Sequence, residues 1–282
     1  MAINYGTKFT ITTGDNFLPT KHAKDLLVAR ENALVFGKWS TRYDVVGAKV
    51  LKIPNLANLA AAGTIDANGD LSDVTPGTDS VITLNLDKKN GYILNIPFDL
   101  ELQSQYNLVS AWSKKAGYGL GNNVDTTLAA LESSSSLTPL GDTGSDVTYN
   151  RVLKAREQAD LNNWPADERY LVLYPTQTTP LLDTDKITNF SGVPYSKSDS
   201  PLLTGEIAQI AGFRVAQSLN VVNLSPGRSN LAFHKEAIAL GMLRDVVIRE
   251  FAETIFARRI GASMYWGSVA QRTDHILRVL SR

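Results

Sequence analysis

The side chains that could carry out catalysis are few, and the first group is Asp142-Thr143-Gly144-Ser145. Aspartic hydrolases use this pattern, and their chemistry needs two carboxylates close enough to share one proton. The chain holds a single copy, so the enzyme would have to be a symmetric dimer that contributes Asp142 from each subunit. The pattern also follows a serine run and Pro139, whereas the hydrolases have an apolar strand there. We therefore interpret it as an ordinary Asp/Gly turn.

Metal-binding patterns are also incomplete. Residues 66–70 offer oxygen ligands at positions 1, 3 and 5 of a calcium loop, but Leu71 and Gly77 occupy the positions that need glycine and a bidentate glutamate. We interpret this stretch as a solvated loop. The histidines are far apart in the sequence and lack a His-Glu-x-x-His pattern. They are His22, His234 and His275.

Nucleotide-binding and nucleophile patterns are missing as well. Gly117, Gly119 and Gly121 lack the spacing of a dinucleotide-binding turn and the strand before it, and the sequence has neither a P-loop lysine nor a Gly-x-Ser-x-Gly elbow. We predict no catalytic, cofactor-binding or metal-binding residues. This favours a structural protein over an enzyme.

The composition is that of a globular protein of one or two domains with no net charge. Its 282 residues include 28 basic and 28 acidic side chains, and 43% are hydrophobic. A protein that binds nucleic acid through its overall charge would be more basic, so DNA contact is expected only locally. The chain has no cysteine, no signal-peptide pattern and no apolar run of the roughly 18 residues that a membrane span needs. We expect a soluble protein without disulfides.

The N-terminal third has apolar positions with little to pack on locally. Residues 1–19 are polar and aperiodic, as in an extended arm, and Thr20 can cap a helix that Gly37 ends. The apolar stripe of this helix needs a partner surface. Residues 43–53 are extended, Pro54 closes them, and a long irregular loop follows over 55–80.

Two alternating runs, 81–86 and 92–96, flank a segment that ends in Asn90-Gly91, which predicts a β-hairpin. Isolated two-stranded ribbons are marginal in water, and loops of about 25 residues are usually functional or disordered. A ribbon that carries such a loop is therefore unusual in a compact monomer.

Residues 98–132 show a helical pattern interrupted by Gly117, Gly119 and Gly121. Each glycine costs about 1 kcal/mol relative to alanine inside a helix. We favour a break into two helices, and a bend point in one helix is the alternative.

The remainder has an α/β pattern without internal repeats. The expected elements are a helix at 151–162, a buried strand at 169–174 stopped by Pro175, a short helix at 178–182, a polar loop at 184–200, turns and short strands at 205–222, a strand at 231–233 that leads into a helix through Ala237, Ile238 and Leu240, and strands within 246–280.

Five segments, taken in their order along the chain, resemble those of a known protein family. They are VGAKVLKIP (46–54), LNLDKK followed by YILNIPF (84–98), NWPADERYLVLYP (163–175), GEIAQIAGFRVAQS (205–218) and NLAFHKEAI (230–238). In this order they resemble the major capsid proteins of tailed double-stranded DNA bacteriophages, which have the Hong-Kong-97-type fold. The likeness covers roughly 43–282, and the three glycines in the presumed spine helix depart from it.

The resemblance implies an α+β fold with an N-terminal arm (1–42), an extended β-hairpin loop (43–97), a peripheral domain with a long spine helix (98–150), an axial α/β domain (151–258) and return strands to the peripheral domain (259–282). It implies pentamers and hexamers that close into an icosahedral shell around double-stranded DNA. Implied partners are further copies of the chain and portal, scaffolding and decoration proteins, with no membrane. The implied location is the virion, after assembly in the host bacterial cytoplasm.

No catalytic residue is implied, but several positions are candidates for contact between subunits. They are Leu26, Leu27, Lys52, Asn55, Leu59, Asp70, Lys88 and Lys89. Two alternatives stay open: an encapsulin-like nanocompartment shell, which would enclose an enzyme in place of DNA, and, more remotely, the dimeric aspartic hydrolase.

Overall fold

The computed structural model describes residues 34–55, 80–97, 108–183, 209–254 and 257–282. The predicted arm, most of the helix from Thr20, the calcium-like loop and the polar loop at 184–200 lie outside these ranges. So do four of the proposed contact residues: Leu26, Leu27, Leu59 and Asp70. No helix among the described residues is both long and apolar enough to cross a membrane.

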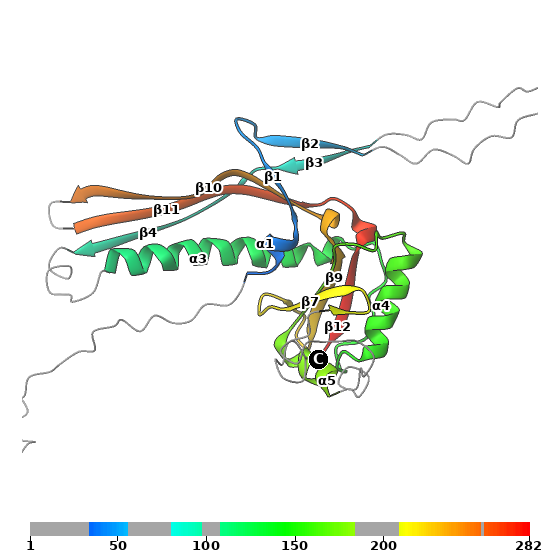
Figure 1. The fold of residues 1–282 in the computed structure, drawn as a ribbon. Helices are drawn as coiled ribbons and strands as arrows, with labels where there is room; N and C mark the ends of the chain where they lie inside the picture. Colours follow the sequence, from blue (N-terminus) through cyan, green and yellow to red (C-terminus); the bar gives the residue numbers. More distant parts are fainter. Residues whose placement is uncertain (1–33, 56–79, 98–107, 184–208, 255–256) are drawn as a thin grey trace, which may run out of the picture.

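One of the two large sheets is a long four-stranded sheet, which we call the long sheet (Figure 1). Its strands lie in the order β1 (Thr41–Asp44), β10 (Ile238–Thr254), β11 (Ala257–Ala270) and β4 (Lys88–Pro97). The pairs are antiparallel except that β1 runs parallel to β10.

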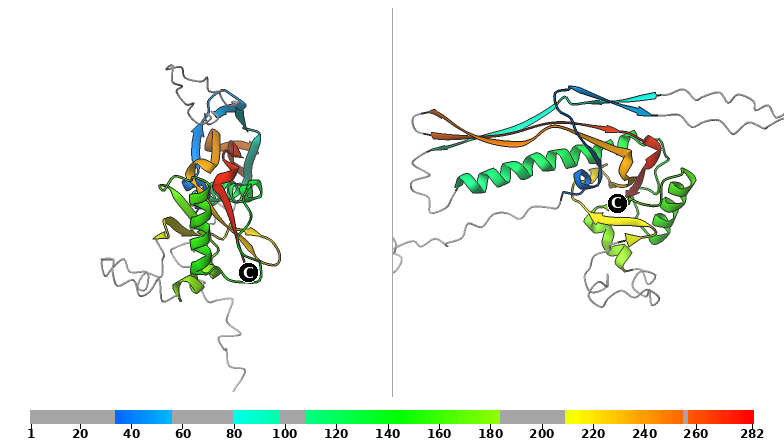
Figure 2. Two further views of the ribbon diagram at one scale, coloured as in Figure 1. Left: turned by 90° about the vertical axis from the view of Figure 1, so that its right-hand side faces the viewer. Right: turned by 45° about the horizontal axis from the view of Figure 1, so that its top comes forward.

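Helix α3 (Leu108–Ala129) runs along one face of the long sheet, and the strands β2 and β3 lie on the opposite face (Figures 1 and 2). Because side chains alternate between the faces of a strand, β11 points Met264 and Trp266 into the core that also contains Leu120 and Val124 of α3. Trp266 is fully buried, and its indole Nε1 donates to Asn90 Oδ1 at 2.9 Å.

The second large sheet, which we call the compact sheet, lies at one end of the long sheet (Figure 1). Its strands are β12 (Ile276–Ser281), β9 (Arg228–His234), β5 (Arg169–Leu173), β7 (Phe213–Gln217) and β6 (Gln209–Ile210), with β8 (Val222–Asn223) paired to β9. Strand β5 is buried along its whole length, which confirms the predicted buried strand. Helices α4 (Tyr149–Leu161) and α5 (Pro175–Leu182) accompany this sheet.

The chain crosses between the two sheets through two short 3₁₀ turns, η3 (Lys235–Ala237) and η4 (Thr273–His275). The predicted helix through Ala237, Ile238 and Leu240 is wrong, because β10 begins at Ile238 and aims Ile238 and Leu240 into the core below the long sheet. Strand β10 belongs to the long sheet and β12 to the compact sheet. The proposed domain boundaries stay predictions.

Strands β2 (Val50–Asn55) and β3 (Ser80–Asn85) form a separate antiparallel pair, which we call the hairpin. The predicted hairpin between 81–86 and 92–96 is wrong, since β3 pairs with β2 while β4 pairs with β11. Asn90 and Gly91 lie inside β4, not in a turn.

Helix α3 is continuous through Gly117, Gly119 and Gly121, so the predicted break into two helices is wrong. Two of these glycines lie at close contacts, because an added Cβ would approach the Tyr92 hydroxyl to 3.0 Å at Gly119 and Leu34 Cδ1 to 2.6 Å at Gly121. The 3₁₀ turn η2 (Ala130–Ser134) extends the helix.

A short helix, α1 (Phe36–Trp39), lies against α3 near the start of the described chain. Gly37 lies inside it, so the prediction that a helix ends there is wrong. The residue before α1, Val35, provides no side-chain cap. Asp125 of α3, which is distant in the sequence, binds a backbone N–H of this helix instead. It is buried, its Oδ1 accepts the Gly37 N–H at 3.1 Å, and its Oδ2 accepts from Asn220 Nδ2 at 3.0 Å.

Candidate functional site

Asp142 lies in a surface turn that follows an isolated β-bridge from Leu140 to Val279. Its Oδ1 accepts the Gly144 N–H at 2.9 Å, and this hydrogen bond is the main reason that the carboxyl pKa is lowered. The Asp142 side chain is 69% exposed. The interpretation of this motif as an Asp/Gly turn is therefore confirmed.

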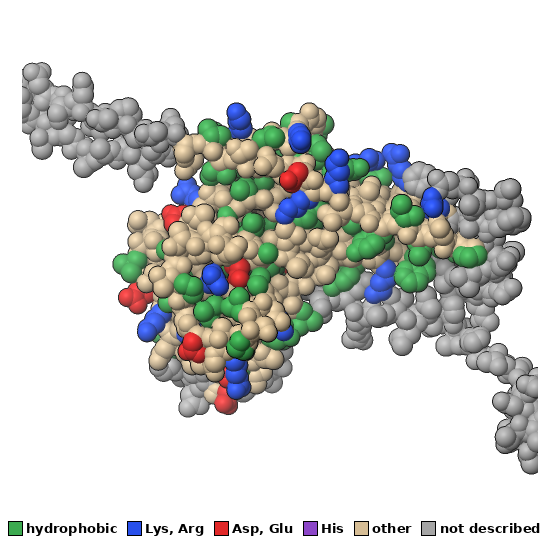
Figure 3. Space-filling model, turned by 180° about the vertical axis from the view of Figure 1, so that it is seen from behind, with side chains coloured by type: hydrophobic (Ala, Val, Ile, Leu, Met, Phe, Trp, Pro, Cys, Tyr) green, Lys and Arg blue, Asp and Glu red, His purple; other side chains and the backbone are tan. Residues whose placement is uncertain are grey.

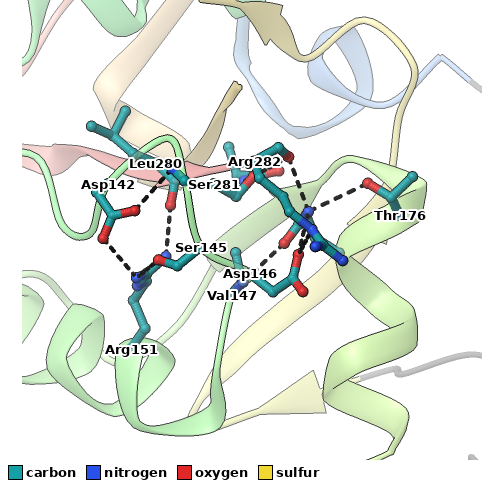
Figure 4. Close-up of polar contacts among 12 residues, drawn as sticks. Asp142, Ser145, Asp146, Val147, Arg151, Thr176, Leu280, Ser281 and Arg282 are labelled. Carbon is teal, nitrogen blue, oxygen red and sulfur yellow. Dashed lines mark hydrogen bonds and ion pairs between the residues drawn. The ribbon is translucent and has the colours of Figure 1, made fainter. Parts of the chain in front are cut away.

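The polar side chains around this turn hold the C-terminal strand in place (Figure 4). Arg151 donates from Nη1 to the carbonyl oxygen of Leu280 at 2.9 Å and from Nη2 to Ser145 Oγ at 2.7 Å. Nε of Arg282 lies 2.7 Å from Asp146 Oδ1. These contacts link β12 and the residue after it to α4 and to the loop before α4, so these polar groups stabilise the fold.

Two histidines that are distant in the sequence come together at the crossings between the sheets. The rings of His234, at the end of β9, and His275, in η4, have centroids 6.0 Å apart, and both side chains are buried. His234 Nδ1 accepts the Glu236 N–H at 3.3 Å, and burial lowers its pKa. His275 Nδ1 lies 3.0 Å from Asp274 Oδ1. Across the described ranges, no group of three metal-ligating side chains forms around this pair or elsewhere.

The hairpin places two of the proposed contact residues on its surface. Lys52 and Asn55 of β2 are exposed, and Asn55 pairs with Ser80 at the far end of the ribbon. Two apolar side chains, Val50 and Val81, are also solvent-exposed here. A two-stranded ribbon with exposed apolar side chains gains little stability on its own, so it has surface available for a partner.

Lys88 and Lys89, the other described contact candidates, begin β4. Lys88 Nζ lies 4.8 Å from the centroid of the Trp266 ring and 3.3 Å from Ser268 Oγ, and burial lowers its pKa. Lys89 is exposed, with Nζ 5.7 Å from the Tyr265 ring centroid. Their role between subunits stays a prediction. Both ammonium groups lie near aromatic rings of β11, and Lys88 is the more buried of the two.

Exposed aromatic and aliphatic side chains between β4 and α3 form a surface that the sequence did not reveal. Ile93 is 72% exposed, and Tyr92 and Trp112 are each 49% exposed. With Ala116 and Gly119 they line a hollow of about 290 Å³. Contiguous exposed apolar surface usually marks an interaction site. The available signal was the pair Tyr92-Ile93. Adjacent strand residues point to opposite faces, so Tyr92 lies on the α3 side, beside Gly119, and Ile93 leaves an apolar side chain on the other face of this edge strand.

Charge is unevenly distributed on the face seen in Figure 3, where lysine and arginine side chains gather over the hairpin and the long sheet, and acidic side chains lie mainly over the compact sheet. The hairpin and long sheet expose several basic residues: Lys49, Lys52, Lys89, Arg244 and Arg249. A neutral chain thus has a locally basic region, as expected for contact with a polyanion or an acidic surface.

Similarity to known proteins is found at the level of structure. No protein-family model and no curated protein matches the sequence. The capsid structure of the cyanophage P-SCSP1u matches with a TM-score of 0.77 at 19% identity, over 100% of this chain and 97% of that chain. A chain from Mycobacterium phage Che8 matches with a TM-score of 0.73 at 18% identity, over 95% and 98%.

The capsid of the native GTA particle matches with a TM-score of 0.74 at 9% identity, over 99% of both chains. The chain therefore has the α+β fold of phage capsid proteins, as the sequence resemblance predicted. The similarity extends over nearly the whole of each chain, including the hairpin and both large sheets.

Proposed function

We propose that the chain is the major capsid protein of a tailed double-stranded DNA bacteriophage, a structural subunit and not an enzyme. Copies assemble into pentamers and hexamers of an icosahedral head that encloses the DNA. The observation that carries this proposal is the end-to-end structural match to capsid chains.

The exposed apolar surfaces support the same function. The hairpin bears Val50 and Val81 on one part of the molecule, and Tyr92, Ile93 and Trp112 are exposed on another. Two different surfaces on one chain favour head-to-tail contacts, which close into rings when the rotation between neighbours permits. Burial between copies then supplies the free energy that holds the shell together.

Further partners follow from this function. The head needs portal and scaffolding proteins and can bind decoration proteins, and the packaged DNA meets the inner surface through local basic regions of an overall neutral chain. Assembly takes place in the cytoplasm of the bacterial host, and the mature location is the virion.

Analytical ultracentrifugation and electron microscopy of the purified protein test the proposal. We expect megadalton particles or capsomers with five- and six-fold symmetry. A monodisperse monomer at every accessible concentration would contradict it. Particles that co-purify with one host enzyme in place of DNA would favour a nanocompartment shell.

A loop-replacement variant tests the role of the hairpin. Residues 56–79 are replaced by Asn-Gly, which joins Asn55 to Ser80 as a two-residue turn. We expect an unchanged circular dichroism spectrum and loss of stable particles. Asp142→Asn serves as the control and should leave particles unchanged. Normal particles from the loop-replacement variant would refute the assigned role.

A further inference from the structure

Two glycines on neighbouring strands of the long sheet support the base of the hairpin. Gly241 of β10 and Gly267 of β11 are direct partners in the strand register, and we call this pair the glycine seat. We propose that the glycine seat fixes the direction in which the hairpin leaves the long sheet, and that this direction determines whether a second copy of the chain can bind. The second part rests on the proposed function.

Side-chain alternation explains why both glycines face the hairpin. On β10, Leu240 and Met242 point into the core shared with α3, so Gly241 between them points to the opposite face. On β11, Trp266 points into the same core, so Gly267 points to the hairpin face. The seat thus presents backbone without side chains to residues 84–86. It lies on the face of the long sheet opposite α3, the side on which Figure 2 shows β2 and β3.

The hairpin inserts leucines into this patch. Leu84 and Leu86 are almost fully buried and form a small cluster with Ala239 of β10. Further along β3, Val81 is 56% exposed. Burial is therefore greatest at the base of the hairpin and decreases towards its far end, where Ile53 and Ile82 are only partly buried.

The contact at Gly267 leaves no space for a side chain. An added Cβ would lie 2.8 Å from the carbonyl carbon of Asn85 and 3.1 Å from Leu86 Cα, and closer still to the Asn85 carbonyl oxygen. These are backbone atoms, which cannot rotate away, so the hairpin would have to lift. At Gly241 the Cβ would meet the side-chain ends of Leu84 and Leu86, which can partly adjust.

Apolar side chains packed around Leu84 and Leu86 and two backbone hydrogen bonds also hold the base of the hairpin among the described residues. The Val45 N–H donates to the Met242 carbonyl oxygen at 2.9 Å, and the Leu86 N–H donates to the Lys49 carbonyl oxygen at 2.9 Å. The second bond closes the hairpin base on itself. Between these two points lies Gly47, whose φ of 76° is a conformation that glycine adopts without strain.

The hairpin amplifies a small change at the seat. Strand β3 has six residues and spans about 20 Å, so a tilt of roughly 10° moves its far end by about 3.5 Å. A shift of that size is enough to separate hydrogen-bonding groups on a neighbouring molecule.

Gly267→Ala and Gly241→Ala test the inference, with Gly117→Ala as the matched control because an added Cβ there meets nothing within 4 Å. The chain has no cysteine, so Lys52→Cys on the hairpin and Lys154→Cys on α4 give a unique pair for spin labels in unassembled subunits. Electron–electron double resonance then measures the distance between them. Particle yield is measured by sedimentation in parallel.

For Gly267→Ala we expect a shifted and broadened distance distribution and a loss of particle yield of at least about tenfold, the factor that corresponds to about 1.4 kcal/mol. Gly241→Ala should show a smaller shift in both, and the control should match the unsubstituted chain. If Gly267→Ala does not fold, the graded effect of Gly241→Ala remains the test.

An unchanged distance in both seat variants would overturn the proposal. A changed distance with normal yield would overturn the link to binding of a second copy. If the unsubstituted chain forms no particles, the proposed function fails while the distance measurement still tests the seat.

Discussion

Replacing Asp125 with alanine is expected to destabilise the folded chain by about 3 kcal/mol and to release α1 from α3. The Asp125 side chain is buried, at 1% exposure, and joins three parts of the fold. It accepts hydrogen bonds from Gly37 in α1 and from Asn220 in the segment after β7.

The magnitude follows from the groups that lose a partner. A hydrogen bond to a charged acceptor contributes about 1.5–3 kcal/mol, and a buried donor left unpaired costs about 1–3 kcal/mol. Two such bonds are lost, and relief of the carboxylate's desolvation offsets part of the loss. A net value of about 3 kcal/mol lowers the melting temperature by about 6–12 °C in a domain of this size.

Thermal melting followed by circular dichroism measures the global effect, and limited trypsin digestion measures the local one. Lys38 is exposed within α1, so release of that helix should speed cleavage after Lys38. Asp142→Ala is the control, because its carboxylate lies in a solvent-exposed turn, where substitutions usually change stability little.

The pH dependence supplies a second check. Burial raises the pKa of Asp125 above 3.8, so protonation of this carboxyl favours the folded state. This pH-dependent part of the stability is complete below pH 3.8 and is lost as the pH rises through the raised value, while the hydrogen bonds from Gly37 and Asn220 act on either side of it. Asp125→Asn removes this dependence while keeping an acceptor for the Gly37 N–H. Asp125→Ala with a melting temperature and Lys38 cleavage rate equal to those of the control would refute the reasoning.

Three other substitutions test other parts of the fold. Burial lowers the pKa of His234, so the fold favours its neutral form and stability should fall as the pH drops below 6.5. His234→Asn should flatten that part of the curve of melting temperature against pH. An equal slope in both proteins would contradict this. Gly117→Ala should stabilise α3 by up to about 1 kcal/mol in chemical denaturation, and a loss of stability would show that the glycine is needed for a bend. Arg169 is buried and donates hydrogen bonds to Asp160 Oδ1 at 2.7 Å and to the Trp164 carbonyl oxygen. Arg169→Ala should therefore lower the free energy of unfolding by about 3 kcal/mol in chemical denaturation. A decrease below about 1 kcal/mol would be inconsistent with these bonds.

Elements whose pattern is local were predictable from the sequence. The apolar run of β5 and the helical periodicity of α4 both indicate the structures that form. These signals are sufficient because each element buries a face that its own residues define.

Glycine misled the prediction in two places for one physical reason. The pattern around Gly91 predicts a turn, but Gly91 lies inside β4, where an added Cβ would approach the Ala262 carbonyl oxygen to 2.9 Å. Gly119 and Gly121 predict a helix break, but they allow Tyr92 and Leu34 to approach α3. A glycine that permits close packing is indistinguishable in the sequence from one that makes a turn.

Sites that depend on distant pairing were equally hidden. His234 and His275 are 41 residues apart, and nothing near either one indicates that the two crossings bring their rings together. The apolar hollow at Tyr92 and Trp112 forms only because β4 pairs with β11 and α3 lies beside them.

The strand order of the long sheet has a consequence for the synthesis of the chain. Strand β1 pairs with β10 and β4 pairs with β11, so segments made early must wait for residues 238–270 before the sheet exists. Contacts between such distant residues slow folding, and a prematurely terminated product lacks the strands that join the rest. A chain that stops before residue 238 therefore lacks both central strands of the long sheet, and with them the face on which Leu84 and Leu86 pack.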